Sequence, residues 1–211
     1  MSSLKWDYSL YLVTDRKYSG QRSLTECVEE AIRGGVSLVQ LREKTASFLE
    51  FYELALGLKE VTSRHNVPLI INDRLDIALA VNADGLHLGQ DDLPIGVARE
   101  HFGEDKVIGI SVSNVQEAIL AEKEGADYLG AGAMFTTGTK TDAKLVSLEE
   151  LRRIKEAVAI PVVAIGGIKE KNAAKIMGAG IDGISVVSAI LAEEDMEMAA
   201  QKLKRIILSQ K

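Results

Sequence analysis

The stretch that decides the fold runs from Val67 to Asp92 and reads VPLIINDRLDIALAVNADGLHLGQDD. It contains two short apolar runs, Pro68–Ile71 and Gly85–Leu88, separated by one helix-sized segment, Leu75–Val81. A strand, a crossover helix and a second strand produce this pattern when the two strands are parallel, because the crossover returns the chain to the same edge of a sheet.

Polar residues follow both apolar runs at the point where each would end. Asn72 and Asp73 follow the first run, and Gln90 and Asp92 follow the second. Two carboxylates flanked by amides on one rim of a sheet suit a hard cation such as magnesium. Asp and Asn are also common in ordinary turns and helix caps, so this stretch alone leaves both interpretations open.

The same alternation extends along the chain in both directions. Capping boxes that begin at Ser23 and Ser47 indicate helices, and further helical segments separate the later runs. The runs are apolar at mostly consecutive positions, as expected for strands covered on both faces. The remaining runs are Leu10–Val13, Ser37–Leu41, Val107–Ile110, Tyr128–Ala131, Pro161–Ile165 and Asp182–Val187.

Eight βα units predict an α/β fold, a (β/α)8 TIM barrel formed by residues 1–211 as a single domain. A doubly wound open sheet is the alternative. It is disfavoured because nothing like GxGxxG follows the first strand and no break divides the chain into halves.

Composition limits the class of protein. The chain has 211 residues, of which 46% are hydrophobic and 27% charged, as in ordinary soluble globular proteins. Its net charge of −6, without a basic stripe, disfavours a nucleic-acid binder. No apolar run approaches the roughly 20 residues that cross a bilayer, and MSSLKWDYSL lacks the apolar core of a secretory signal. We therefore expect a cytoplasmic protein that binds no membrane, with its lone Cys27 buried in a helix.

In a parallel barrel the residues after each strand meet at one mouth, where such enzymes carry out their chemistry. Gln40, Arg42 and Lys44 share parity, so a strand continued to Lys44 would point all three to the same side. His87 lies within an apolar run and is interpreted as a packed core residue rather than a ligand. The other polar or glycine positions expected at the mouth are Asn72, Asp73, Gln90, Asp92, Ser111, Thr136, Thr137, Thr139, Lys140, Gly166, Gly167 and Ser188.

This set indicates a site for phosphorylated substrates. Arg and Lys suit phosphate oxygens, and two Asp carboxylates can hold a magnesium ion that binds a diphosphate. Gly166, Gly167 and the segment at Ser188 follow the last two runs, where barrels of this kind bind a monophosphate through backbone amides. Each feature also has an ordinary explanation: solvated charges at Arg42 and Lys44, a tight turn at the glycines, and a surface excursion at 132–146.

The chain also resembles the thiamine-phosphate synthase family over nearly its whole length. The motifs occur in the family's order: YLVTDR (11–16), VQLREK (39–44), INDR (71–74), DGLHLGQDD (84–92), IGIS (108–111), TGTK (137–140), VVAIGGI (162–168) and GISVVSAI (183–190). The resemblance implies a barrel that couples hydroxymethylpyrimidine diphosphate to a thiazole phosphate carboxylate. Diphosphate would leave first, and the thiazole nitrogen would then attack the pyrimidine cation.

The resemblance also implies roles for individual residues. Asp73 and Asp92 would ligate Mg2+, and Arg42, Ser111 and Lys140 would be catalytic. The pyrimidine diphosphate would bind to Gln40, Leu41, Arg42, Glu43, Lys44, Asn72, Ser111 and Lys140. The thiazole phosphate would bind to Thr137, Gly138, Thr139, Gly167, Val187 and Ser188. A homodimer is suggested by the resemblance alone.

Two departures from the family pattern bear on the alternatives. The family often has proline in the segment that here reads Gly132-Ala133-Met134-Phe135, and often has histidine where Ser113 stands. A related thiazole tautomerase carries a catalytic histidine near the position of Ala133, and alanine cannot move a proton. Tautomerase activity is therefore disfavoured. A tautomerase-like or phosphosugar-type barrel enzyme stays one alternative, and a non-catalytic barrel that binds thiamine phosphates is another.

Overall fold

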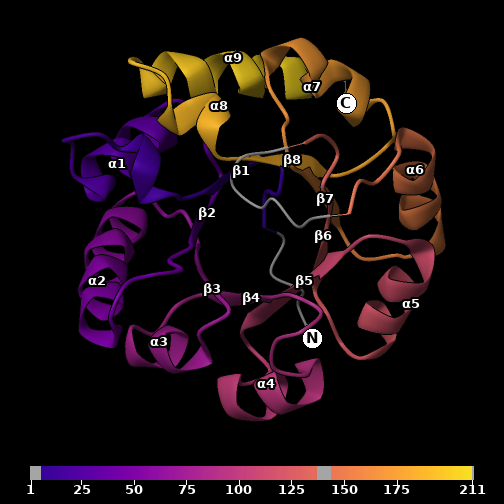
Figure 1. Ribbon diagram of the computed structural model, residues 1–211, viewed down its shortest axis with the longest axis horizontal. Helices are drawn as coiled ribbons and strands as arrows, with labels where there is room; N and C mark the ends of the chain where they lie inside the picture. The colour runs from indigo at the N-terminus through magenta and orange to yellow at the C-terminus, as the bar shows by residue number, and fades with distance from the viewer. Residues whose placement is uncertain (1–5, 137–143, 211) are drawn as a thin grey trace.

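The computed structural model describes residues 6–136 and 144–210 of the chain. Eight parallel strands close into a barrel in chain order, β1 through β8, and the helices surround it (Figure 1). The closing pair is β1 with β8, in which Tyr11 lies opposite Ser185. The predicted (β/α)8 barrel is confirmed, and the open-sheet alternative is wrong because no strand edge is left unpaired among the eight.

The observed elements agree with the predicted ones to within one or two residues at most ends. The strands are β1 (Leu10–Val13), β2 (Leu38–Leu41), β3 (Leu69–Asn72), β4 (Gly85–Leu88), β5 (Val107–Val112), β6 (Tyr128–Gly132), β7 (Val162–Ile165) and β8 (Gly183–Val186). The helices are η1 (Arg16–Tyr18), α1 (Leu24–Arg33), α2 (Phe48–Arg64), α3 (Leu75–Ala80), α4 (Ile95–Phe102), α5 (Val115–Lys123), α6 (Leu148–Ala157), α7 (Glu170–Met177), α8 (Ser188–Leu191) and α9 (Met196–Leu208). The short helices η1 and α8 were not predicted. No helix in the described ranges is long and apolar enough to cross a membrane.

Each strand buries both of its faces. Leu10 and Leu12 of β1 belong to the large apolar cluster between the strands and the helices. Tyr11 and Val13, which alternate with them, belong to a smaller cluster inside the barrel. Alternation with a period of two therefore sorts the strand residues into an outer packing layer and an inner one. This explains why the apolar runs are continuous in the sequence.

The predicted capping boxes are formed to different degrees. At α1 the hydroxyl of Ser23 accepts from the Glu26 backbone N–H, and the Glu26 carboxylate accepts in return from the Ser23 N–H. At α2 the Ser47 hydroxyl caps the backbone of Glu50, but the Glu50 carboxylate pairs with Arg16 at 2.5 Å. The Glu50 carboxylate therefore links α2 to the segment after β1 instead of completing the capping box.

Three acidic residues clamp the barrel at the amino ends of its strands. Each precedes an even-numbered strand, and its carboxylate accepts a hydrogen bond from the backbone N–H of the first or second residue of the strand before. Asp84 accepts from Leu69 at 2.8 Å, Asp127 from Ile108 at 2.7 Å and Asp182 from Val162 at 2.8 Å. A helix-borne cation holds each carboxylate: Lys59 of α2, Arg99 of α4 and Lys155 of α6.

The first pair of strands has a fourth clamp built from different residues. Ser37 precedes β2 and accepts from the Leu10 backbone N–H at 3.2 Å. The cation here is Lys204 of α9, which bonds to Ser9 and, at 2.8 Å, to Asp7. The last helix therefore plays for β1 the part that α2, α4 and α6 play for β3, β5 and β7.

Candidate active site

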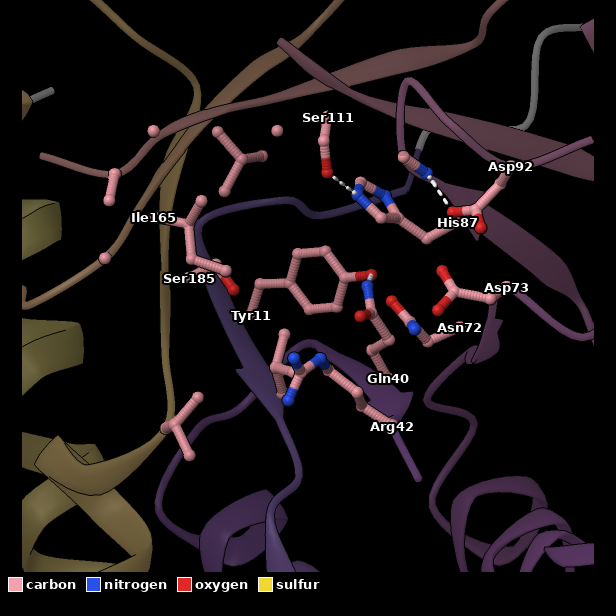
Figure 2. Close-up of a pocket in the computed structure, with 18 of the residues that line it drawn as sticks. Tyr11, Gln40, Arg42, Asn72, Asp73, His87, Asp92, Ser111, Ile165 and Ser185 are labelled. Carbon is pink, nitrogen blue, oxygen red and sulfur yellow. Dashed lines mark hydrogen bonds between the residues drawn. The ribbon is translucent and has the colours of Figure 1, made fainter. Parts of the chain in front are cut away.

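A cavity of about 320 Å³ opens at the carboxyl ends of the strands, and all eight strands or their following turns contribute to its lining. Gln40, Arg42 and Lys44 all line it, as the parity argument predicts. Figure 2 shows Gln40 and Arg42 extending into the same space as Asn72 and Asp73. The backbone N–H of Arg42 donates to the buried hydroxyl of Thr14 at 3.1 Å, which anchors the turn after β2.

Two of the predicted binding residues turn their side chains away from the cavity. Leu41 is fully buried in the outer apolar cluster. The buried side chain of Glu43 pairs with Arg16 at 2.9 Å. A ligand would meet these residues through their backbone, so their predicted roles stay predictions.

The structure brings Asp73 and Asp92 together at the mouth of the cavity (Figure 2). Asp73 has a left-handed backbone (φ 62°), and its N–H donates to the carbonyl of His87 at 2.9 Å. Asp92 accepts from the Gly89 N–H at 2.6 Å. Partial burial removes water from the Asp73 carboxylate and raises its pKa to about 6, and the adjacent Asp92 carboxylate contributes to this rise. The charge of Arg42 lowers the pKa of Asp73, but more weakly.

These two carboxylates suit a metal that also binds substrate. Among the described residues, no group of three or more His, Cys, Asp or Glu side chains could enclose a metal ion. Magnesium does not require such an enclosure, because it is usually held by one or two carboxylates, by substrate phosphates and by water. A cation would also relieve the mutual repulsion that raises the pKa of Asp73.

A series of hydrogen bonds runs beneath the cavity and includes two tyrosines that the sequence analysis did not select. Gln40 Nε2 donates to the Tyr11 hydroxyl at 2.6 Å, and that hydroxyl lies 2.8 Å from the Tyr128 hydroxyl. Tyr128 lies 2.8 Å from His87 Nδ1, and His87 Nε2 lies 2.9 Å from Ser111 Oγ. His87 is buried as expected, but it also lines the cavity and holds Ser111. Strand parity, applied to Tyr11 on β1, would have pointed to this interior layer.

Ser185 was also missed. It is 3% exposed, lines the cavity from β8, and its hydroxyl has no hydrogen-bond partner among the described residues. Because a buried hydroxyl without a partner costs free energy, this group is a candidate for contact with a bound substrate. Ser185 stands two positions before Val187, which also lines the cavity. Strand alternation from Val187 is therefore the signal that could have found Ser185.

The predicted monophosphate side of the site is described in part. Gly166 and Val187 line the cavity, whereas Gly167 and Ser188 are not among its lining residues. Gly166 and Gly167 both have positive φ, and a Cβ on Gly166 would lie 2.6 Å from the Ala133 Cβ. The glycine pair therefore makes a turn and also admits the segment after β6. The predicted residues Thr137, Gly138, Thr139 and Lys140 lie outside the described residues.

Comparisons with known proteins give the family of the chain. The family model described as thiamine monophosphate synthase matches residues 10–190. A thiamine-phosphate synthase from Clostridium acetobutylicum is 57% identical over 201 residues, which are 95% of this chain and 95% of that protein. The chain belongs to the thiamine-phosphate synthase family. It is therefore a transferase of thiamine biosynthesis, and the family resemblance noted in the sequence is confirmed.

Further members of the thiamine-phosphate synthase family extend the match. The protein from Ruminiclostridium cellulolyticum is 55% identical over 205 residues, covering 97% of this chain and 98% of its own. The solved structure of thiamine phosphate pyrophosphorylase from Pyrococcus furiosus superposes with a TM-score of 0.91 at 43% identity, covering 99% of both chains. A 3-hexulose-6-phosphate synthase structure shares only the fold, with 17% identity and a TM-score of 0.68.

Proposed function

We propose that this enzyme couples hydroxymethylpyrimidine diphosphate to a thiazole phosphate carboxylate in a magnesium-dependent substitution that releases pyrophosphate. One observation carries the proposal: the Asp73 and Asp92 carboxylates share a cavity with Arg42 and Lys44. Opposite charges that do not pair with one another, placed at one mouth, are what a metal-bound diphosphate requires.

The side chains around the cavity divide the work of a dissociative substitution. Asp73 and Asp92 would hold magnesium, and the chemistry it would supply is positive charge that favours departure of the diphosphate. Arg42 and Lys44 would bind the outer phosphate oxygens, Arg42 as a planar fork and Lys44 as a compact charge. Asn72 would bind the same pyrimidine diphosphate next to Arg42 and Lys44. No strong base is needed, because the thiazole nitrogen attacks with its own lone pair.

The remaining predicted contacts complete the proposal. Ser111 and Lys140 would serve the pyrimidine diphosphate, with Leu41 and Glu43 contributing backbone groups. The thiazole phosphate would be bound by Thr137, Gly138, Thr139, Gly167, Val187 and Ser188. The tautomerase alternative lacks support, because Ala133 lines the cavity and offers no proton-transferring group.

The deciding test is a coupling assay that measures pyrophosphate release. Release should require both phosphorylated substrates and magnesium, and Asp92→Asn should reduce it strongly. The matched control is Asp105→Asn, a carboxylate exposed near the amino end of β5 and far from the mouth. Full activity of Asp92→Asn, or full activity with a chelator, would show that the metal assignment is wrong. Tight binding of thiamine phosphate with no coupling would favour the non-catalytic barrel instead.

The expected homodimer stays a prediction that rests on the resemblance. Light scattering of the purified chain measures the mass in solution, and a monomeric mass at working concentration would contradict it.

A further inference from the structure

The hydrogen bonds beneath the cavity can be followed in one direction from Gln40. Its amide nitrogen can only donate, so the Tyr11 hydroxyl oxygen accepts and the Tyr11 proton is left for Tyr128. Tyr128 then has its own proton available for His87 Nδ1. A neutral imidazole whose Nδ1 accepts carries its proton on Nε2, and Nε2 faces the hydroxyl of Ser111.

With the Gln40 amide in this orientation, the opposite direction leaves a buried donor without an acceptor. If His87 donated to Tyr128, Tyr128 would donate to Tyr11, and Tyr11 would accept twice. The proton of Tyr11 would then have no acceptor, because its hydroxyl contacts only Gln40 and Tyr128 among the described residues. Tyr11 is 2% exposed, so water does not compensate this loss.

The surrounding backbone makes room for these rings. A Cβ on Gly109 would lie 2.1 Å from ring atoms of Tyr128, and a Cβ on Gly130 would lie 3.1 Å from His87 Cε1. The strands carry glycine where the two rings must pass. Burial also raises the pKa of the Tyr11 and Tyr128 hydroxyls, so both remain protonated and able to donate.

We propose that Tyr128, whose hydroxyl accepts from Tyr11, is a positioning residue that holds His87 as its Nε2–H tautomer and thereby makes Ser111 a hydrogen-bond donor toward the bound substrate. Ser111 Oγ accepts from His87, so its own proton is directed into the cavity that it lines. At the other end, Gln40 has used its nitrogen on Tyr11 and presents its carbonyl oxygen. The floor then offers one acceptor and one donor to a heteroaromatic ring that carries an amino group and a ring nitrogen.

The inference deepens the proposed coupling reaction, so its test includes a measurement that needs no turnover. Nitrogen chemical shifts of the His87 imidazole, in the full chain labelled at histidine with the heavy nitrogen isotope, identify the tautomer. The expected result is the Nε2–H form in the unmodified protein and loss of that preference in Tyr128→Phe. An Nδ1–H or doubly protonated imidazole in the unmodified protein overturns the inference, whether or not the chain couples its substrates.

Kinetics provide the second arm. Tyr128→Phe should lower kcat by about tenfold to a hundredfold through misplacement of Ser111, with little change in KM for the pyrimidine diphosphate. The matched control is Tyr8→Phe. Tyr8 packs on Tyr128 at 5.1 Å between ring centroids, yet its hydroxyl makes no hydrogen bond with the described residues. Equal behaviour of the two variants would reduce Tyr128 to a packing role and overturn the inference.

A third variant keeps the inference testable if Tyr128→Phe does not fold. Tyr11→Phe leaves Tyr128 in place as the donor to His87, so the Nε2–H tautomer should persist. The Gln40 amide loses its acceptor in this variant and is free to turn over. We therefore expect a smaller loss of kcat than in Tyr128→Phe. A change of the His87 tautomer in Tyr11→Phe would contradict the proposed direction of the hydrogen bonds.

Discussion

Removing the charge of Asp73 should stabilise the metal-free protein. The pKa of this carboxyl is about 6 in the folded chain against an ordinary value of 3.8, because of lost hydration and the adjacent Asp92 carboxylate. Between these two pH values the folded chain holds more protons than the unfolded chain, so the free energy of unfolding falls as the pH rises. The loss is complete above about pH 6 and absent below the ordinary value. Asp73→Asn should abolish it.

The magnitude follows from the same pKa. The difference between 3.8 and about 6 corresponds to roughly 3 kcal/mol if the site were fully shielded from water. Asp73 is exposed at the mouth, so solvent screening reduces the expected gain to about 1 kcal/mol. For a chain of this size that gain raises Tm by about 2–4 °C. Asparagine also tolerates the left-handed backbone at this position, so the substitution adds no strain.

Thermal unfolding followed by circular dichroism measures the effect. In metal-free buffer at about pH 8, Asp73→Asn should melt above the unmodified protein, and the gap should shrink as the pH falls toward about 5. Magnesium with pyrophosphate should then raise the Tm of the unmodified protein more than that of the variant, because a ligand stabilises the form it binds.

A carboxylate on the neighbouring helix provides the control. Asp76 lies 2.6 Å from Arg74, and the hydrogen bonds from Arg74 lower the pKa of Asp76. Asp76→Asn should therefore slightly lower Tm, opposite in sign to Asp73→Asn. A Tm of Asp73→Asn at or below that of the unmodified protein at about pH 8 would refute the reasoning, as would a gap that does not change with pH.

Three further predictions separate stability from chemistry. Asp84→Asn weakens the contacts to Lys59 and Leu69 and should lower the free energy of unfolding by about 2 kcal/mol, measured by urea unfolding. Its kcat/KM should not change, and a large loss of activity in the folded variant would contradict this separation. Ser185→Ala removes a buried hydroxyl without a partner and should stabilise the substrate-free protein by about 1 kcal/mol, whereas destabilisation would indicate an unrecognised partner. Arg42→Lys keeps the charge but loses the planar fork, so KM for the pyrimidine diphosphate should rise by about tenfold, and an unchanged KM would exclude a bidentate contact.

The sequence was sufficient for the barrel because every strand is apolar on both faces and is followed by a helical segment. Strand ends were harder to predict. The strand predicted as Val107–Ile110 continues to Val112, because Ser111 pairs with Gly130 in the sheet although its side chain is polar. Helix α8 was missed because a short apolar run after β8 does not distinguish strand from helix by periodicity.

The rule that polar residues after strands lie at the mouth gave the positions of Arg42, Asp73 and Asp92, which the structure brings to one cavity. It failed for Tyr11 and Tyr128, which lie within strands and meet only because the barrel closes. These two residues are 117 positions apart, so no local pattern could indicate their contact.

The four clamps define a repeating unit of the barrel that does not start at the first strand of the chain. Each unit begins with a cation-bearing helix and ends with an even-numbered strand, and the unit that contains β1 takes its cation, Lys204, from the last helix. During synthesis the first quarter of the barrel is therefore the last to be completed. Until α9 has left the ribosome, β1 and β2 lack the cation that the other strand pairs already hold.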